Sequence, residues 1–152
     1  MKKHISSRLF AFALVLVSIF MIFPGSSFAI RANAVEVVTP YYNNTLSART
    51  TIAISPSGEL SVVYAYHGIQ NVTTMAVITT YIEKKVLGLF WTRVDIGTPD
   101  DQWVDTIYDY AHNGEHSLQL DSKGTYRVTV TFHIYGSGGA MDEIERQETK
   151  TY

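Results

Sequence analysis

Apolar and polar residues alternate along most of this chain after position 45. Residues 60–66 and 126–134 carry an apolar or aromatic side chain at every second position, and residues 46–54 do so except at Thr50; this is the period of a strand with one buried face. Further strands are predicted over 73–84, 91–96, 102–111, 117–120 and 144–152. No segment has a helical period of useful length. The pattern therefore predicts a domain built from strands.

Turn-forming residues separate the predicted strands. Pro56-Ser57-Gly58, residues 98–101 and residues 121–124 are turn sequences. Asn113-Gly114 predicts a hairpin turn, because this pair accepts the positive φ angles of a type I′ turn. Turns recur about every 8–12 residues, which is the spacing of a β-sandwich.

Residues 120–128, Leu-Asp-Ser-Lys-Gly-Thr-Tyr-Arg-Val, resemble the start of the sixth strand of immunoglobulin-like domains. In those domains a tyrosine hydroxyl folds back onto the preceding backbone and forms the tyrosine corner. Tyr126 holds the matching position, and Val128 stands where an antibody domain has a cysteine. The expected fold class is all-β, an immunoglobulin-like antiparallel β-sandwich of about seven to eight strands.

The first 34 residues have the pattern of a secretory signal peptide. A basic start is followed by an apolar run over 9–23, the helix breaker Pro24-Gly25 and a series of small residues. The run has about 15 residues, short of the roughly 20 that a membrane-spanning helix needs. We expect cleavage after Ala34, or after Ala29. The domain plan is then a signal peptide over 1–34, a short lead over 35–44 and the β-sandwich domain over 45–152.

Removing the signal peptide changes the charge balance. The whole chain has a net charge of −2, but the part after Ala34 keeps 8 basic and all 14 acidic residues. An acidic domain repels phosphate backbones and anionic lipid, so we expect no nucleic-acid partner and no stable membrane anchor. The absence of cysteine excludes disulfides, thiol catalysis and lipidation at the export site.

The order of features from Tyr41 onward resembles small exported β-sandwich proteins of unassigned function from Gram-positive, clostridia-like bacteria. The similar segments are Leu46-Ser47-Ala48 with the strand to Ile54, Ser57-Gly58, Tyr81-Ile82-Glu83-Lys84-Lys85, Phe90-Trp91-Thr92-Arg93-Val94 and residues 124–130. The resemblance implies export and an immunoglobulin-like fold. It implies no catalytic residue.

Aromatic side chains are the main candidates for ligand binding. Exposed aromatics on a sandwich can stack on sugar rings, but aromatics also fill sandwich cores. We expect Trp91 to be the leading core residue among them. The candidate ligand-binding residues are Trp103, Tyr108, Tyr110 and Phe90.

Residues 86–90, Val-Leu-Gly-Leu-Phe, form an unusually apolar hairpin connection. Two interpretations stay open. The tip inserts into a membrane or a partner's groove, or it folds back as a lid over the end of the sandwich.

Two other candidate sites, a zinc-peptidase pattern and a group of acids, are better explained as structural features. Residues 112–116 fit H-x-x-E-H, a zinc-peptidase pattern, but Asn-Gly at its centre opposes the helix that such a site needs. Acids at 95, 100, 101, 105 and 109 are expected to form a solvated face rather than a calcium site. We therefore expect no metal site and no cofactor.

The sequence favours a secreted, extracellular protein that is not an enzyme. The expected role is a binding or structural module that acts as a monomer, with a protein or a cell-envelope glycan as its partner. One alternative is a hydrolase of cell-envelope polymers that uses the acids at 100–109. A second alternative is a secreted toxin or bacteriocin-like protein whose membrane element is 86–90. Two carboxylates converging in a cleft would favour the hydrolase.

Overall fold

The computed structural model describes residues 41–152; the predicted signal peptide and both cleavage sites lie outside the described residues. The strands are β1 (Thr45–Ile54), β2 (Glu59–Gly68), β3 (Thr73–Val86), β4 (Phe90–Arg93), β5 (Trp103–Ile107), β6 (Ala111–Gln119), β7 (Thr125–Gly136) and β8 (Asp142–Thr151). A 3₁₀ turn, η1 (Pro99–Asp101), precedes β5. The described part of the chain contains no helix long and apolar enough to cross a membrane.

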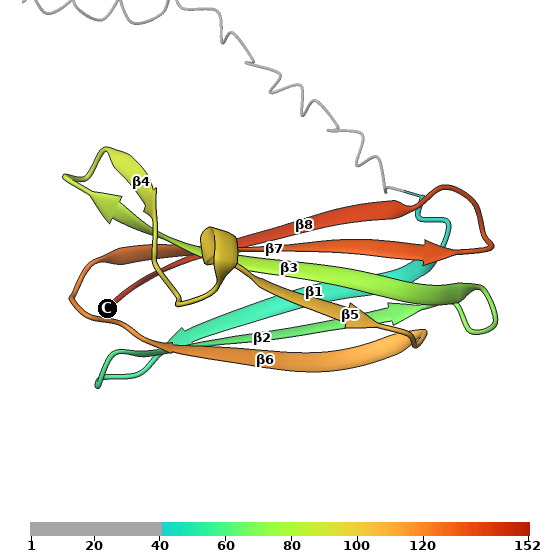
Figure 1. The fold of residues 1–152 in the computed structure, drawn as a ribbon, viewed down its shortest axis with the longest axis horizontal. Coiled ribbons are helices and arrows are strands. Elements are labelled where there is room, and N and C mark those ends of the chain that lie inside the picture. The colour runs from blue at the N-terminus through green and yellow to red at the C-terminus, as the bar shows by residue number, and fades with distance from the viewer. Residues whose placement is uncertain (1–40) are drawn as a thin grey trace, which may run out of the picture. The chain divides into compact units, whose positions relative to one another are not determined.

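Two antiparallel sheets form a sandwich, which confirms the predicted all-β sandwich class (Figure 1). One sheet has the order β1-β2-β6. The other has the order β4-β3-β7-β8, and β5 also pairs with β3. Strand β4 pairs with the last residues of β3 and β5 with its earlier part, so both lie on the same edge of β3.

The core lies between the sheets and follows the predicted alternation. Leu60, Val62, Tyr64 and Tyr66 on β2 are buried, as are all five inward positions predicted on β7, from Tyr126 to Ile134. Each such side chain contributes about 1.5–3 kcal/mol by leaving water. The prediction is wrong at Leu46, which is exposed because the β1–β2 register shifts between Thr45 and Ser47 and leaves it in a bulge.

The predicted hairpin at Asn113-Gly114 is wrong, because both residues lie within β6. The chain turns earlier, over 108–110, where it crosses from β5 in one sheet to β6 in the other. Gly114 is paired with Tyr64, and a Cβ atom at Gly114 would overlap the Tyr64 ring. The glycine therefore permits close packing here and does not serve a turn.

The tyrosine-corner hydrogen bond is confirmed. The Tyr126 hydroxyl donates to the Ser122 carbonyl oxygen at 2.6 Å, and the turn before β7 is fixed to the start of that strand. Trp91 is not in the core, contrary to expectation. It lies partly exposed on the outer face of β4, where the Arg127 guanidinium lies 4.3 Å from the centroid of its ring.

A buried polar cluster closes one end of the sandwich, which we call the anchored end (residues 41–45, 69–73 and 136–142). The Asp142 carboxylate accepts hydrogen bonds from the backbone N–H groups of Asn43 and Asn44 and from the Thr45 hydroxyl, each at 2.8 Å. The Asn44 amide donates to the Ala140 carbonyl oxygen at 2.9 Å. These bonds join the start of β1 to the β7–β8 loop.

The opposite end, which we call the hairpin end, comprises residues 84–95, 118–127 and 148–152. The β3–β4 hairpin projects here beyond the two sheets, and the C-terminus lies at the same end (Figure 1). Lys84 donates to the Ser122 hydroxyl at 2.5 Å, so β3 contacts the β6–β7 turn. The two ends are therefore built differently.

Candidate functional site

The tip of the β3–β4 hairpin exposes four neighbouring apolar side chains. The exposed fractions are 40% for Val86, 84% for Leu87, 73% for Leu89 and 63% for Phe90. The lid interpretation is therefore wrong, because a lid folded over the sandwich would be buried. Four adjacent apolar side chains in water are an unfavourable arrangement that a binding partner would relieve.

The turn at the tip has an unusual residue in a demanding position. Leu89 N–H donates to the Val86 carbonyl oxygen at 3.0 Å, and φ is +53° at Leu87 and +70° at Gly88. A type I′ turn requires positive φ at both central residues and strongly prefers Asn-Gly. A leucine in this conformation is unfavourable for the isolated turn. The apolar side chain at the tip is therefore held there at the expense of local stability.

Basic side chains gather around this tip. Six of the eight Lys and Arg residues after position 40 belong to the hairpin end. They are Lys84, Lys85, Arg93, Lys123, Arg127 and Lys150. Within residues 41–152, only Arg127 among them forms an ion pair, with Glu83 at 2.6 Å. The hairpin end thus combines an apolar tip with cations that have few carboxylate partners.

Aromatic rings hold several of these cations on the outer face of the sheet. Lys85 and Arg127 both lie over Trp91, at 5.7 and 4.3 Å from the ring centroid. Arg93 lies 3.5 Å from the centroid of the Tyr81 ring. Such contacts stabilise by about 0.5–1 kcal/mol at exposed sites. They order the cations beside the tip and connect β4 to the rest of the sheet.

A pocket of about 230 Å³ opens between the sheets beneath the hairpin. Its wall includes Lys84, Val86 and Arg93 from the hairpin, Tyr126 from the neighbouring strand β7, and Leu118 from β6 in the opposite sheet. The tyrosine corner fixes the position of Tyr126 in this wall. The pocket therefore lies next to both the exposed apolar side chains and the cations.

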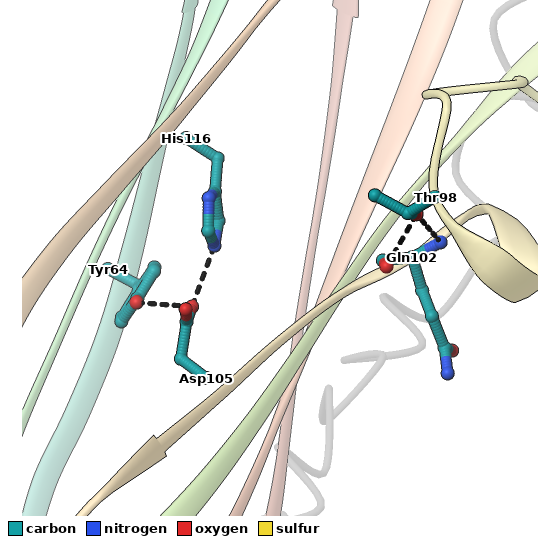
Figure 2. A network of polar contacts seen from close by, with 5 residues as sticks. All are labelled: Tyr64, Thr98, Gln102, Asp105 and His116. Carbon is teal, nitrogen blue, oxygen red and sulfur yellow. Dashed lines mark hydrogen bonds and ion pairs between the residues drawn. The ribbon is translucent and has the colours of Figure 1, made fainter.

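A second cluster, Tyr64–Asp105–His116, lies between β2, β5 and β6 (Figure 2). The Tyr64 hydroxyl donates to Asp105 Oδ2 at 2.5 Å, and His116 Nε2 lies 2.7 Å from the same oxygen. Burial, and then the hydrogen bond to Asp105, raise the pKa of Tyr64 above its ordinary value. Figure 2 also shows Thr98 and Gln102, which are bonded to one another through the Thr98 hydroxyl.

The contacts of this cluster converge on one atom. The hydroxyl and the imidazole both bond to one carboxylate oxygen, and the Trp103 ring stacks on His116 with 4.6 Å between centroids. The cluster ties β5 to the opposite sheet. Asp105 is thus half-buried, and the expectation that it belongs to a solvated acidic face is wrong.

The four candidate aromatic residues do not form one site. Phe90 is at the hairpin tip, whereas Trp103 packs on His116 against the core. Tyr108 is 79% exposed, and Tyr110 lies 5.7 Å from the ring of His67. Ile107 pairs with Ala76 at one end of β3 and Phe90 pairs with Val86 at the other, ten residues apart. At about 3.3 Å per residue, roughly 33 Å separate Ile107, which precedes Tyr108, from Phe90.

A polar hollow lies on the outer face of β1, β2 and β6, near Tyr110. Its wall includes Arg49, His67 and Asn113, and the small Ala65 lies among them. Arg49 and Asn113 both pair with Ala65 across the strands, which explains the depression. This hollow is the alternative place for a polar ligand such as a glycan.

The H-x-x-E-H residues lie on strand β6 and not on a helix. The rings of His112 and His116 both lie near Tyr64, at 6.3 and 5.6 Å between centroids. Among residues 41–152, no three His, Asp or Glu side chains are placed to hold a metal ion.

Sequence reasoning missed the basic residues of the hairpin end. Lys84-Lys85 beside an apolar pentapeptide was a visible signal, but Lys123, Arg127 and Lys150 join it only through strand pairing. It also missed Asp142, which a sequence cannot distinguish from the exposed acids that follow it.

No family model matches this chain, and no curated protein matches it. Among solved structures, it is similar to part of wild-type OgpA from Akkermansia muciniphila, with a TM-score of 0.40 and 10% identity over 74% of this chain and 32% of that chain. It is also similar to catalytically inactive OgpA in complex with an O-glycopeptide (glycodrosocin) substrate, with the same TM-score and identity, over 78% of this chain and 32% of that chain. The chain thus spans about a third of the length of these structures. Likeness at this level says nothing about an activity of this chain.

Proposed function

We propose that this chain is an exported, non-enzymatic binding module that attaches to the cell envelope through its hairpin end. The signal-peptide pattern of residues 1–34 supports export and an extracellular location. The tyrosine-corner bond of Tyr126 and the two-sheet strand order support an immunoglobulin-like fold. The resemblance to exported Gram-positive proteins agrees with this assignment.

The exposed apolar tip carries the proposal. Leu87, Leu89 and Phe90 are more than half exposed, and they lie beside a pocket and a group of ordered cations. A partner that covers the tip gains about 25 cal/mol for each Å² of apolar surface removed from water. No other region of residues 41–152 combines these three features.

The hydrolase alternative has less support. Among the acids at 100–109, Asp105 is the one whose carboxylate lies against the core. It is hydrogen-bonded to Tyr64 and His116. Within residues 41–152, no hydrogen bond or ion pair brings a second carboxylate to it. General acid–base hydrolysis of a glycan needs two carboxyl groups across one bond.

A matched pair of variants tests the proposal. Phe90→Asp and Tyr108→Asp each replace an exposed aromatic side chain by the same charge, at opposite ends of the sandwich. We expect Phe90→Asp to lower binding to isolated cell envelopes by about tenfold or more, and Tyr108→Asp to leave it unchanged. Loss of binding in Tyr108→Asp alone would move the site to the end that bears the polar hollow and contradict the proposal.

The exposed tip also favours one second candidate, the membrane-active secreted protein. Insertion of Val86, Leu87, Leu89 and Phe90 would disturb a bilayer locally. Leakage of dye from liposomes, abolished by Phe90→Asp, would support this role. Binding to envelopes without leakage would leave the attachment module as the assignment.

A further inference from the structure

We propose that the hairpin end docks on the surface of an anionic phospholipid bilayer. The proposal rests on the proposed function, because it names the component of the envelope that the hairpin end binds. It is a peripheral attachment, in which the tip enters the interface and the sheets remain outside.

The tip has the chemistry of an interfacial element. Leu87 and Leu89 flank Gly88 at the point of the hairpin, and Phe90 follows at the start of β4. Leucine and phenylalanine are the residues with which peripheral proteins enter the boundary between headgroups and acyl chains. The positive φ of Leu87 adds an independent observation, because asparagine would suit the turn better and bind such a boundary worse.

The cations lie at the depth that a bilayer requires. Lys85 is adjacent to Val86, and Arg93 pairs with Glu83, three residues back along β3. At about 3.3 Å per residue, these cations lie roughly 3–10 Å behind the tip. An apolar element buried about 5–10 Å into the interface would therefore bring them to the level of the lipid phosphates.

The distribution of charge over the domain leads to the opposite conclusion about anionic lipid from its net charge. The domain is acidic overall, which predicted repulsion from anionic lipid. Yet the hairpin end holds six of the eight cations against three acids, Asp95, Asp121 and Glu148, while the anchored end holds Asp142 and no Lys or Arg. Charge separated in this way orients the molecule with its hairpin end toward a negative surface.

A soluble phosphate polymer fits the cations but not the tip. Such a polymer is hydrated and would leave Leu87 and Leu89 exposed to water. A bilayer accommodates both features, because phosphates lie at its surface and hydrocarbon lies beneath. We therefore assign the bilayer as the occupant of this end.

The test is co-sedimentation with vesicles of phosphatidylcholine, with and without phosphatidylglycerol. Residues 40–152 form a compact unit that contains the whole core, so this fragment keeps the N-terminal apolar run out of the assay. We expect binding to the vesicles with phosphatidylglycerol, weakening as salt is added.

Two matched pairs of variants locate the contact. Leu87→Asp should weaken binding about tenfold or more, whereas Leu46→Asp, at an exposed leucine of the anchored end of β1, should not. Lys123→Glu should weaken binding about fivefold or more, whereas Arg49→Glu, at an exposed arginine away from the hairpin end, should not. Both Asp variants must keep the wild-type unfolding midpoint.

Three results would overturn the proposal. These are no binding to vesicles with phosphatidylglycerol, equal losses within either pair, or inorganic polyphosphate binding that Leu87→Asp leaves intact. If envelopes bind through Phe90 while the vesicles do not, the bilayer is wrong and the attachment function stands. If Phe90→Asp leaves envelope binding unchanged, the attachment function itself is wrong.

Discussion

The two ends of the sandwich are built on the same strands but differ in which side chains they bury and which they expose. At the anchored end, buried Asn44 and Asp142 find hydrogen-bond partners inside the domain and join the start of β1 to the β7–β8 loop. At the hairpin end, Leu87 and Phe90 are exposed to water and are covered by nothing within residues 41–152. Strands β3 and β7 run between the two ends. Internally hydrogen-bonded polar groups are thus concentrated at one end and exposed apolar side chains at the other.

This contrast distinguishes the side chains that maintain the fold from those that are free to contact a partner. Side chains whose polar atoms are satisfied internally hold the structure, and changing them should alter stability. Side chains that are exposed although they are apolar contribute little to stability, and changing them should alter binding.

The largest effect is expected at the anchored end, from Asp142→Ala. The change leaves the buried N–H of Asn44 and the hydroxyl of Thr45 without their acceptor. We expect a loss of about 4 kcal/mol in the free energy of unfolding, measured by urea denaturation. Leu87→Asp is the control at the hairpin end and should change the same free energy by less than about 0.5 kcal/mol. Similar losses in both variants would break the comparison.

A pair of glycine substitutions compares the two ends directly. A Cβ atom at Gly138 would overlap the Asn43 carbonyl oxygen, whereas a Cβ atom at Gly88 meets nothing within 4 Å. We expect Gly138→Ala to lower the unfolding free energy by about 3 kcal/mol. Gly88→Ala should lower it by only about 1 kcal/mol, through its φ of +70°. A larger loss at Gly88 would show that the hairpin also stabilises the fold.

A smaller effect is expected from Tyr66→Phe. The Tyr66 hydroxyl donates to the Asp109 carbonyl oxygen at 2.8 Å, and its loss should cost about 1 kcal/mol at neutral pH. Burial, followed by the charge of Asp109, raises the pKa of Tyr66 from 10.0 to about 12. The folded protein thus keeps a proton that the unfolded chain loses, so stability falls as pH rises from 10.0 to about 12.

The phenylalanine variant should lose part of that alkaline decline. Unfolding midpoints measured across the same pH range, for the wild type and the variant, give the comparison. An identical decline in both proteins would show that Tyr66 does not cause it.

The smallest effect is a gain in stability from Leu87→Asn. Asparagine adopts positive φ more readily than leucine and completes the preferred Asn-Gly pair with Gly88. We expect the unfolding free energy to rise by about 0.5–1 kcal/mol while envelope binding falls. Higher stability with unchanged binding would show that Leu87 has no role in attachment.

The pattern along the chain predicted the fold well where one face of a strand is buried. The inward positions of β2 and β7 follow from simple alternation, and Tyr126 follows from a local motif. The prediction from the sequence was wrong where one pair of residues suits two different environments. Asn113-Gly114 can form a turn, but here Gly114 accommodates the ring of Tyr64, which lies far away in the sequence.

The candidate site was predicted only in part, for a reason of register. The apolar run at 86–90 is visible in the sequence, and so is Phe90. The cations Lys123 and Lys150 reach that end only because β3, β7 and β8 pair in one particular register. Pairing likewise separates Phe90 from Tyr108 and Tyr110, which the sequence presented as one group of aromatics.

The two tryptophans allow the most direct test of the central claim, that the hairpin end contacts the ligand. Trp91 lies beside Phe90 on the hairpin, and Trp103 lies on β5 against His116. In the variant Trp103→Phe, the emission of Trp91 should shift to shorter wavelength when vesicles with phosphatidylglycerol are added. In Trp91→Phe, the emission of Trp103 should not change. A shift of Trp103 alone, or no shift of Trp91 in protein that has bound, would contradict the account.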